Sequence, residues 1–334
     1  MDSTLHHKAV KRNTFKLPPE ILLDIFQRLP TRDLKSVRQV CWVFCRSASP
    51  YLVRSVYISG LHRDLVLKAA SEHPLFAKHV TELVSNTSIF DKRLVTDKFQ
   101  KRNYERYLRR QIKDGQHFDH ELTEEDLAKS HERYLDYYWE QRSLFQSGEP
   151  VVCLTAALPL LPKLQKLRVV RGWKYLELDG DEGGPSGRSW DITIVPPGIC
   201  GGNNEGELNS WYWECESRWM EIFLKMLLAT AFTNRPLLSL DMGLPGFGVS
   251  MDSLDLSSAD LGHWQNAFCH LQSLELGVDS KTYQGTTLGA VVQSAPGLEI
   301  LRLHLTRCVG NLISLIQLLG TRFTIGISFN HNNK

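Results

Sequence analysis

The chain has 334 residues, 42% of them hydrophobic and 23% charged, and a formal net charge of +2 at pH 7. This composition is ordinary for a globular protein of one large or two moderate domains, and the small net charge excludes a global field that attracts nucleic acid or anionic membrane. Seven cysteines, an odd number without framework spacing, indicate reduced thiols, so we expect a cytoplasmic or nuclear protein.

The first 14 residues carry basic side chains but no apolar stretch, so they lack the features of a secretory signal and predict a disordered tail. The longest apolar run, residues 222–232, is interrupted by Lys225 and is too short to span a bilayer. It predicts a core helix, and we expect no membrane partner.

Residues 17–46 predict two short amphipathic helices joined by a turn. The first begins after Pro18, ends at Pro30, and has apolar residues spaced to form one broad face. Thr31 and Asp33 supply N-cap chemistry for the second. Two helices this small cannot cover so wide an apolar face, so the rest of the chain or another protein must cover it.

The order of residue types in this stretch resembles the F-box, a short helical domain. The matching positions are Leu17, Pro18, Glu20, Ile21, Leu22, Ile25, Phe26, Leu29, Pro30, Asp33, Leu34, Val37, Val40, Cys41 and Phe44. Trp42 departs from the family pattern, which more often has Arg or Lys at that position. The alternative interpretation is an ordinary buried helical hairpin.

The resemblance implies that an F-box at residues 15–50 docks onto the Skp-family adaptor of a cullin-based ubiquitin ligase, with helix-face side chains filling a groove of the partner. The adaptor-binding residues would be Leu17, Pro18, Ile21, Leu22, Ile25, Phe26, Leu29, Leu34, Val37, Val40 and Cys41. The chain would be a receptor for an unknown target protein and not an enzyme. The alternatives are an F-box scaffold that is not coupled to degradation and a nucleic-acid-binding protein.

Residues 51–334 repeat a pattern of one apolar residue, two residues, a second apolar residue, one residue and a third apolar residue. Copies begin at Val53, Val80, Leu164, Leu237, Leu271 and Leu298, and the first and last pairs of starts are each 27 apart. The copy at Val80 has Ser85 in the third position. Leucine-rich repeats have periods of about 20–29 residues, and the last two apolar positions of each copy predict a short strand. The irregular series resembles that of fungal F-box proteins.

We therefore expect an α/β fold, in which a helical F-box is followed by an irregular leucine-rich-repeat solenoid with a helical insertion. A mixed α/β domain with chance matches is the alternative. Residues between inward leucines are candidates for target contact; four examples are Arg168, Asp241, Glu275 and Arg302. Helices are predicted at 214–232, from Ser257 or Ser258 to Ala267, from Thr286 or Thr287 through Val292, and at 312–319, with a last strand at 323–327.

Two insertions interrupt the repeats. Residues 91–150 are highly charged and predict a helical hairpin, whose second helix starts at Thr123 with a capping box to Asp126. Its basic first helix interleaves Tyr104 and Tyr107, a pattern typical of nucleic-acid contact or, alternatively, of a solvated face paired with an acidic neighbour.

The second insertion, residues 179–210, is rich in Gly, Pro, Asn and Ser and predicts a mobile loop. Aromatic residues follow it at Trp211, Tyr212, Trp213 and Trp219, either as contact anchors or as packing for the loop.

No pattern predicts catalysis. Residues 184–189 lack the spacing of a nucleophile elbow or of a phosphate loop. The sequence offers no second group of metal-ligand residues to complete a site with His117, Asp119 and His120. It also offers no second pair of ligands to complete a site with Cys41 and Cys45. We expect no metal ion and no cofactor.

Overall fold

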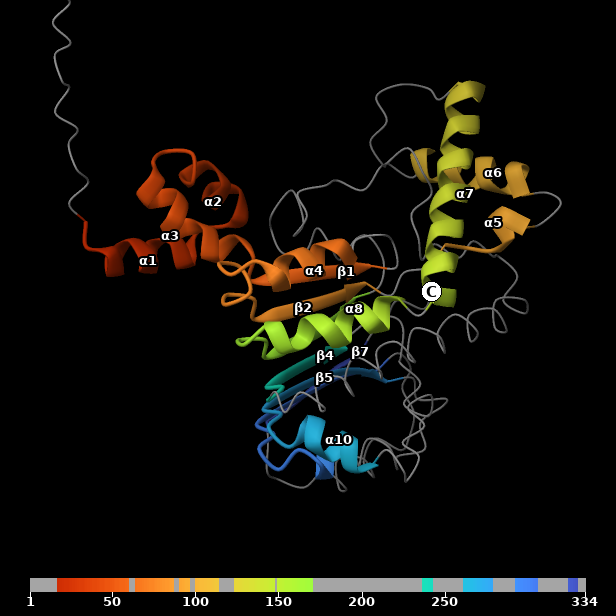
Figure 1. The fold of residues 1–334 in the computed structure, drawn as a ribbon. Coiled ribbons are helices and arrows are strands. Elements are labelled where there is room, and N and C mark those ends of the chain that lie inside the picture. Colours follow the sequence, from red (N-terminus) through yellow and green to blue (C-terminus); the bar gives the residue numbers. More distant parts are fainter. Residues whose placement is uncertain are drawn as a thin grey trace, which may run out of the picture. The chain divides into compact units, whose positions relative to one another are not determined.

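The computed structural model describes residues 17–59, 64–86, 90–96, 100–113, 123–147, 149–170, 236–242, 261–278, 292–305 and 324–329. The chain divides into two compact units, Met1–Leu52 and Val53–Lys334 (Figure 1). The predicted tail at 1–14, the loop at 179–210 with the aromatic residues after it, and the helices predicted at 214–232 and 312–319 lie outside the described residues. Of the helix predicted from Thr286 or Thr287 through Val292, the structure describes only Val292, which packs against the core.

The described part of the N-terminal unit contains three helices, α1 (Pro19–Arg28), α2 (Thr31–Val37) and α3 (Trp42–Leu52). The prediction of a single second helix was wrong, because that stretch breaks between α2 and α3. There the backbone N–H of Gln39 donates to the carbonyl of Ser36, and that of Val40 to the carbonyl of Val37. These bonds reach back only three residues, so the chain tightens into a turn and α3 starts afresh.

Proline precedes the first two helices of this unit. Pro18 is the N-cap of α1 and Pro30 that of α2, and neither helix has a side-chain cap hydrogen bond. The predicted side-chain N-cap of the second helix is therefore absent. Proline fits these positions because the first backbone N–H groups of a helix have no partner within it.

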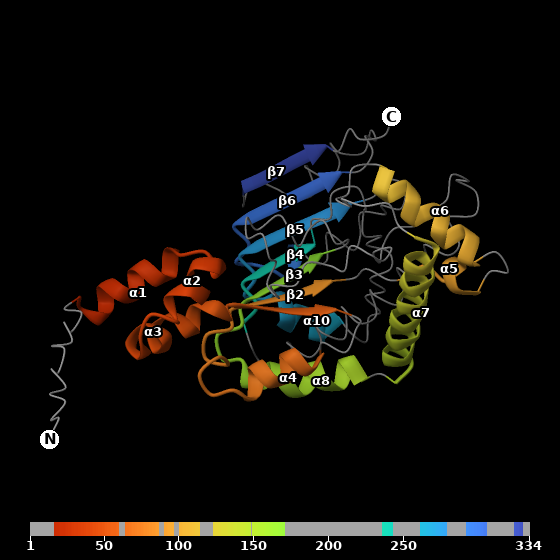
Figure 2. The same cartoon turned by 90° about the horizontal axis from the view of Figure 1, so that it is seen from above.

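The described residues of the second unit form one parallel sheet of seven strands, whose spatial order is the order along the chain (Figure 2). The strands are β1 (Ser55–Ser59), β2 (Glu82–Asn86), β3 (Lys166–Val170), β4 (Ser239–Met242), β5 (Ser273–Val278), β6 (Ile300–Leu305) and β7 (Thr324–Phe329). The α/β class and the strands predicted from the repeated apolar pattern are confirmed.

The register of the sheet aligns the pattern from strand to strand. The central apolar positions pair in one row, namely Val56, Leu83, Leu167, Leu240, Leu274, Leu301 and Ile325. The backbone repeats too: Thr81 and Glu82 donate to the carbonyl of Arg54, and Gln165 and Lys166 to that of Thr81. The described strands therefore begin at equivalent positions of successive repeats.

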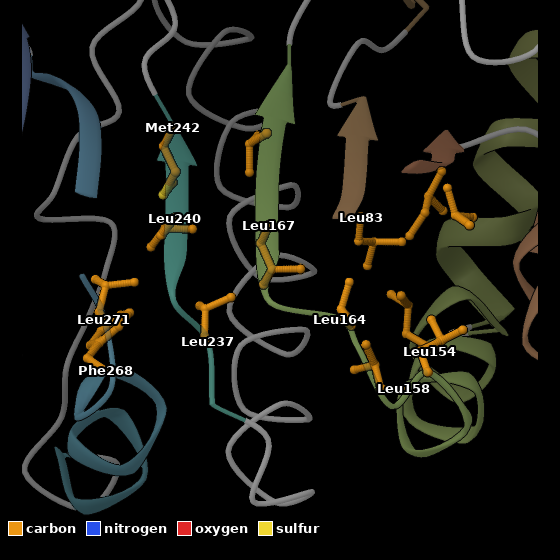
Figure 3. Close-up of a cluster of buried hydrophobic side chains, with 14 of the residues drawn as sticks. Leu83, Leu154, Leu158, Leu164, Leu167, Leu237, Leu240, Met242, Phe268 and Leu271 are labelled. Atoms are coloured by element: carbon orange, nitrogen blue, oxygen red, sulfur yellow. The ribbon is translucent and has the colours of Figure 1, made fainter. Parts of the chain in front are cut away.

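The leucine-bearing face of the sheet forms the core of this unit (Figure 3). It packs against α4 (Asp64–Glu72), α8 (Glu149–Ala157), the 3-10 turn η1 (Leu158–Leu160) and α10 (Leu261–Phe268), which contribute Leu67, Leu154, Leu158 and Phe268 among others. Because side chains alternate along a strand, the intervening residues lie on the opposite face.

The predicted helical hairpin is present as α6 (Gln100–Lys113) and α7 (Glu124–Ser147), preceded by the short α5 (Arg93–Thr96). Its capping box is confirmed: Thr123 Oγ1 donates to Asp126 at 2.7 Å, and the Asp126 backbone N–H donates to Thr123 Oγ1 at 3.2 Å. These helices share their own core, which includes Phe90, Leu108, Leu127 and Tyr134.

The hairpin corrects one part of the nucleic-acid hypothesis. Tyr104 is fully buried and its hydroxyl is hydrogen-bonded to Ser130 at 2.5 Å, so its ring cannot stack on a base. Arg109 on α6 instead pairs with Glu124 of α7 at 2.7 Å. This contact agrees with the alternative of a solvated basic face paired with its acidic neighbour.

Candidate functional site

The predicted adaptor-binding residues divide into two sets by burial. Leu22, Phe26 and Leu34 are buried in the core of the N-terminal unit, where Phe26 packs edge-on against Phe44 with ring centroids 5.4 Å apart. Leu29 and Val37 are partly buried against the same core. The three buried residues hold the helices together, and their direct contact with an adaptor stays a prediction.

The second set stays exposed. Ile21 and Ile25 are 49% and 42% exposed and lie one turn apart on α1, so their side chains follow one side of the helix. Leu17, four residues before Ile21, is also exposed, as is Pro18. The side chains of Leu17, Ile21 and Ile25 form a small exposed apolar patch along α1, and contiguous apolar patches of this kind can serve as contact surfaces.

Polar residues border this side of α1. Asp24 and Arg28 form an exposed ion pair at 3.1 Å, and their helical positions lie next to those of Ile21 and Ile25. Leu23, also exposed, lies about 200° around the helix from Ile21, on the other side. The exposed apolar stripe therefore has a charged rim, the usual arrangement of a protein contact surface.

A second exposed apolar group lies at the start of α3. Val40 and Trp42 are 68% and 71% exposed, and Val43 is also exposed. Cys41, one of the predicted adaptor-binding residues, is exposed as well. The guanidinium of Arg46 lies 5.4 Å from the centre of the Trp42 ring. This cation–π contact restricts the indole while leaving most of its surface open to a partner.

Sequence reasoning missed Trp42 and Val43 as contact candidates. The departure of Trp42 from the family pattern was the available signal, because a large aromatic residue in place of a solvated cation changes what the position offers. We define the exposed apolar surface of this unit as Leu17, Ile21, Ile25, Val40, Trp42 and Val43. Burying each side chain fully contributes roughly 1–3 kcal/mol, so a partner that covers several of them gains substantial affinity.

The polar face of the sheet is a second candidate. The register pairs Arg168 with Asp241, Asp241 with Glu275 and Glu275 with Arg302, so the four predicted target-contact residues lie in one row. They sit on the face opposite the leucines. Glu275 also pairs with Arg302 at 3.2 Å and with His304 at 2.7 Å.

The same face carries a charged group nearer β1. Glu82 contacts Lys166 and Arg168, each at 3.1 Å, and accepts a hydrogen bond from Ser55 at 2.5 Å. The polar face is thus organised as cross-strand pairs of opposite charge.

The described residues hold no group of three or more His, Cys, Asp or Glu side chains arranged for a metal ion. Cys41, which directly precedes α3, is exposed, and Cys45 on α3 is partly buried. His117, Asp119, His120 and residues 184–189 lie outside the described residues. Within the described part of the chain, no helix combines the length and apolar character that crossing a bilayer requires.

Comparison with known proteins bears on the N-terminal unit. Residues 14–59 match the family model of the F-box-like domain, a range that includes all three N-terminal helices. No curated protein matches the chain. The chain therefore carries an F-box-like domain at its N-terminus, followed by an α/β unit with a parallel sheet.

Proposed function

We propose that this chain is the substrate-recognition subunit of a Skp–cullin–F-box ubiquitin ligase. One observation carries the proposal: the segment that matches the F-box-like model leaves Ile21 and Ile25 exposed on one side of α1. F-box domains generally bind Skp-family adaptors, and an amphipathic helix laid into an apolar groove is a recurring recognition mode. The adaptor in turn links the chain to a cullin.

The adaptor contact in this proposal is the exposed apolar surface, together with Pro18 and Cys41. Leu17, Ile21 and Ile25 are its anchors on α1, and the Asp24–Arg28 pair lies at its rim. Buried apolar anchors ringed by polar residues dominate the binding energy of most interfaces. Leu22, Phe26 and Leu34 act indirectly, by keeping the helices in place.

The second unit would hold the target protein. Its seven parallel strands in chain order, with 27-residue steps between β1 and β2 and between β5 and β6, support an irregular leucine-rich-repeat solenoid of the kind found in fungal F-box proteins. Polar residues of the face opposite the leucines, such as Arg302, would contact the target. The chain itself forms no covalent bond with the target. It raises the local concentration of the target near the enzyme that carries ubiquitin. We place this activity in the cytoplasm or nucleus.

The test is binding of the purified chain to a purified Skp-family adaptor, measured by calorimetry. We expect Ile21→Asp with Ile25→Asp to weaken binding at least about 100-fold, because each change places a charge in an apolar groove. Both side chains are exposed, so the variant should fold. Leu29 is unsuitable for this purpose because it packs against the core.

The matched control is Leu23→Asp with Gln27→Asp. These residues are also exposed and one turn apart on α1, but they lie on the other side of the helix. The control changes the net charge by the same amount as Ile21→Asp with Ile25→Asp. It should bind within about threefold of the wild type, because it spares the anchors. Equal loss in both double variants, or none in either, would contradict the docking site.

Coupling to ubiquitin transfer needs a separate measurement. Proteins captured by the wild-type chain should be ubiquitylated by the reconstituted ligase, and this modification should fail with the Ile21→Asp, Ile25→Asp variant. Capture without ubiquitylation by a complete, active ligase would indicate the scaffold alternative.

A further inference from the structure

Basic side chains gather where the first three strands begin. Arg54 directly precedes β1, Lys78 and His79 precede β2, and Lys163 precedes β3. Both lysines are exposed, and Arg54 and His79 are partly buried. We call these four residues the basic cluster; they belong to neither the exposed apolar surface nor the paired charges of the polar face.

The register of the sheet explains how residues so distant in sequence meet. Glu82 pairs with Lys166, so His79 and Lys163, each three residues earlier, occupy equivalent turns of neighbouring repeats. The carbonyl of Arg54 accepts from the backbone of Thr81, which fixes the start of β1 beside the same turn. Neighbouring strands lie about 4.8 Å apart, so these turns stack closely.

The electrostatics show that the charges of the cluster act on one another. The pKa of His79 is lowered, first by its burial and then by the nearby cations of Lys163, Lys78 and Arg54. Every charged group that acts on this imidazole is therefore positive. Within the described part of the chain, neither Lys78 nor Lys163 forms an ion pair with a carboxylate.

Other basic residues of this unit are arranged differently. Lys166 and Arg168 share Glu82, and Arg302 pairs with Glu275. Helix-borne lysines are paired as well, Lys68 with Glu72 and Lys129 with Glu125. Because like charges held together are unfavourable unless an anion joins them, the exposed Lys78 and Lys163 are complementary to a negative partner.

We propose that the basic cluster binds an anionic peptide segment, one that carries several carboxylates or phosphates, on the target protein. The inference rests on the proposed function in one respect, that the second unit holds the target. A peptide fits better than a nucleic acid, because the cluster spans only the starts of three strands and the whole chain has a net charge of +2.

The probes are two fluorescein-labelled dodecapeptides, one of alternating glutamate and serine and one with phosphoserine in place of serine. Fluorescence anisotropy measures their binding to the full chain at low ionic strength. We expect both to bind, with affinity falling as salt rises, and Lys78→Glu with Lys163→Glu to weaken binding at least about 10-fold. Tighter binding of the phosphopeptide would identify phosphate as the preferred anion, and equal binding would identify carboxylate as sufficient.

The matched control is Lys68→Glu with Lys129→Glu, which changes the net charge by the same amount at lysines that already have carboxylate partners. It should bind the peptides within about twofold of the wild type, because it leaves the cluster intact. Equal loss in the two double variants would mean that net charge alone attracts the peptide, and failure of the wild type to bind either peptide would also overturn the proposal.

A local readout accompanies the affinity. Nuclear magnetic resonance titration of the His79 imidazole should show its pKa rising when the peptide is bound, because an adjacent anion favours the protonated ring. An unchanged His79 pKa in the peptide complex, or displacement of the peptide by a twelve-nucleotide single strand at equal concentration, would contradict a peptide site. Adaptor binding should be unchanged in Lys78→Glu with Lys163→Glu, so failure here is distinguishable from failure of the docking proposal.

Discussion

The two units differ in how far they bury their apolar side chains. On α1, Ile21 and Ile25 remain nearly half exposed, whereas Leu274 on β5 and Leu301 on β6 have no exposed surface. Each inner strand has a strand on either side and a core beneath it, so stacked repeats cover one another. Within residues 17–52, the described helices α1, α2 and α3 enclose only a small core, so part of their apolar surface remains exposed.

This difference predicts that truncation has unlike effects in the two units. Leu301→Ala should lower the free energy of unfolding of the second unit by about 3 kcal/mol, because it leaves a cavity in a packed core. Ile21→Ala should change the stability of the first unit by less than about 0.5 kcal/mol, since the side chain is largely solvated. Hydrogen exchange resolved by peptide reports each unit separately.

The two truncations should have the reverse order of effect on adaptor binding. Ile21→Ala should weaken it and Leu301→Ala should leave it unchanged below the unfolding transition. A large loss of stability from Ile21→Ala would mean that its side chain is a core residue, and the contrast between the units would fail.

A smaller difference in stability is expected between buried and exposed residues of the single helix α1. Leu22 and Leu23 are neighbours on α1, but Leu22 is buried and Leu23 exposed. Leu22→Ala should destabilise the N-terminal unit by about 2 kcal/mol and Leu23→Ala by less than about 0.5 kcal/mol. Hydrogen exchange of peptides from α1, α2 and α3, measured in each variant, would compare the two losses of stability. Similar losses would contradict the burial assigned to α1.

Local chemistry explains how much of the fold was predictable. The strands followed from apolar residues at alternate positions, and the start of α7 followed from Thr123 and Asp126, because both signals lie within a few residues. The break between α2 and α3 did not follow. Val37 and Val40 keep helical spacing across it, and neither glycine nor proline marks the turn.

The candidate sites depend on information that a single segment lacks. The sequence of α1 predicts a broad apolar face, but only packing against α3 determines that Phe26 faces inward and Ile25 outward. The basic cluster was not predicted, because Arg54, His79 and Lys163 belong to three separate segments. Only the register of the strands brings them together.

Hydroxyl-radical footprinting of the chain with and without a saturating Skp-family adaptor tests the central claim most directly. Exposed Trp139 on α7, in the other unit, provides the internal reference. We predict that oxidation of Ile21 and Ile25 slows at least about fivefold in the complex while that of Trp139 is unchanged, because desolvated anchors exclude water. Unchanged oxidation of Ile21 and Ile25 in a saturated complex would contradict the account.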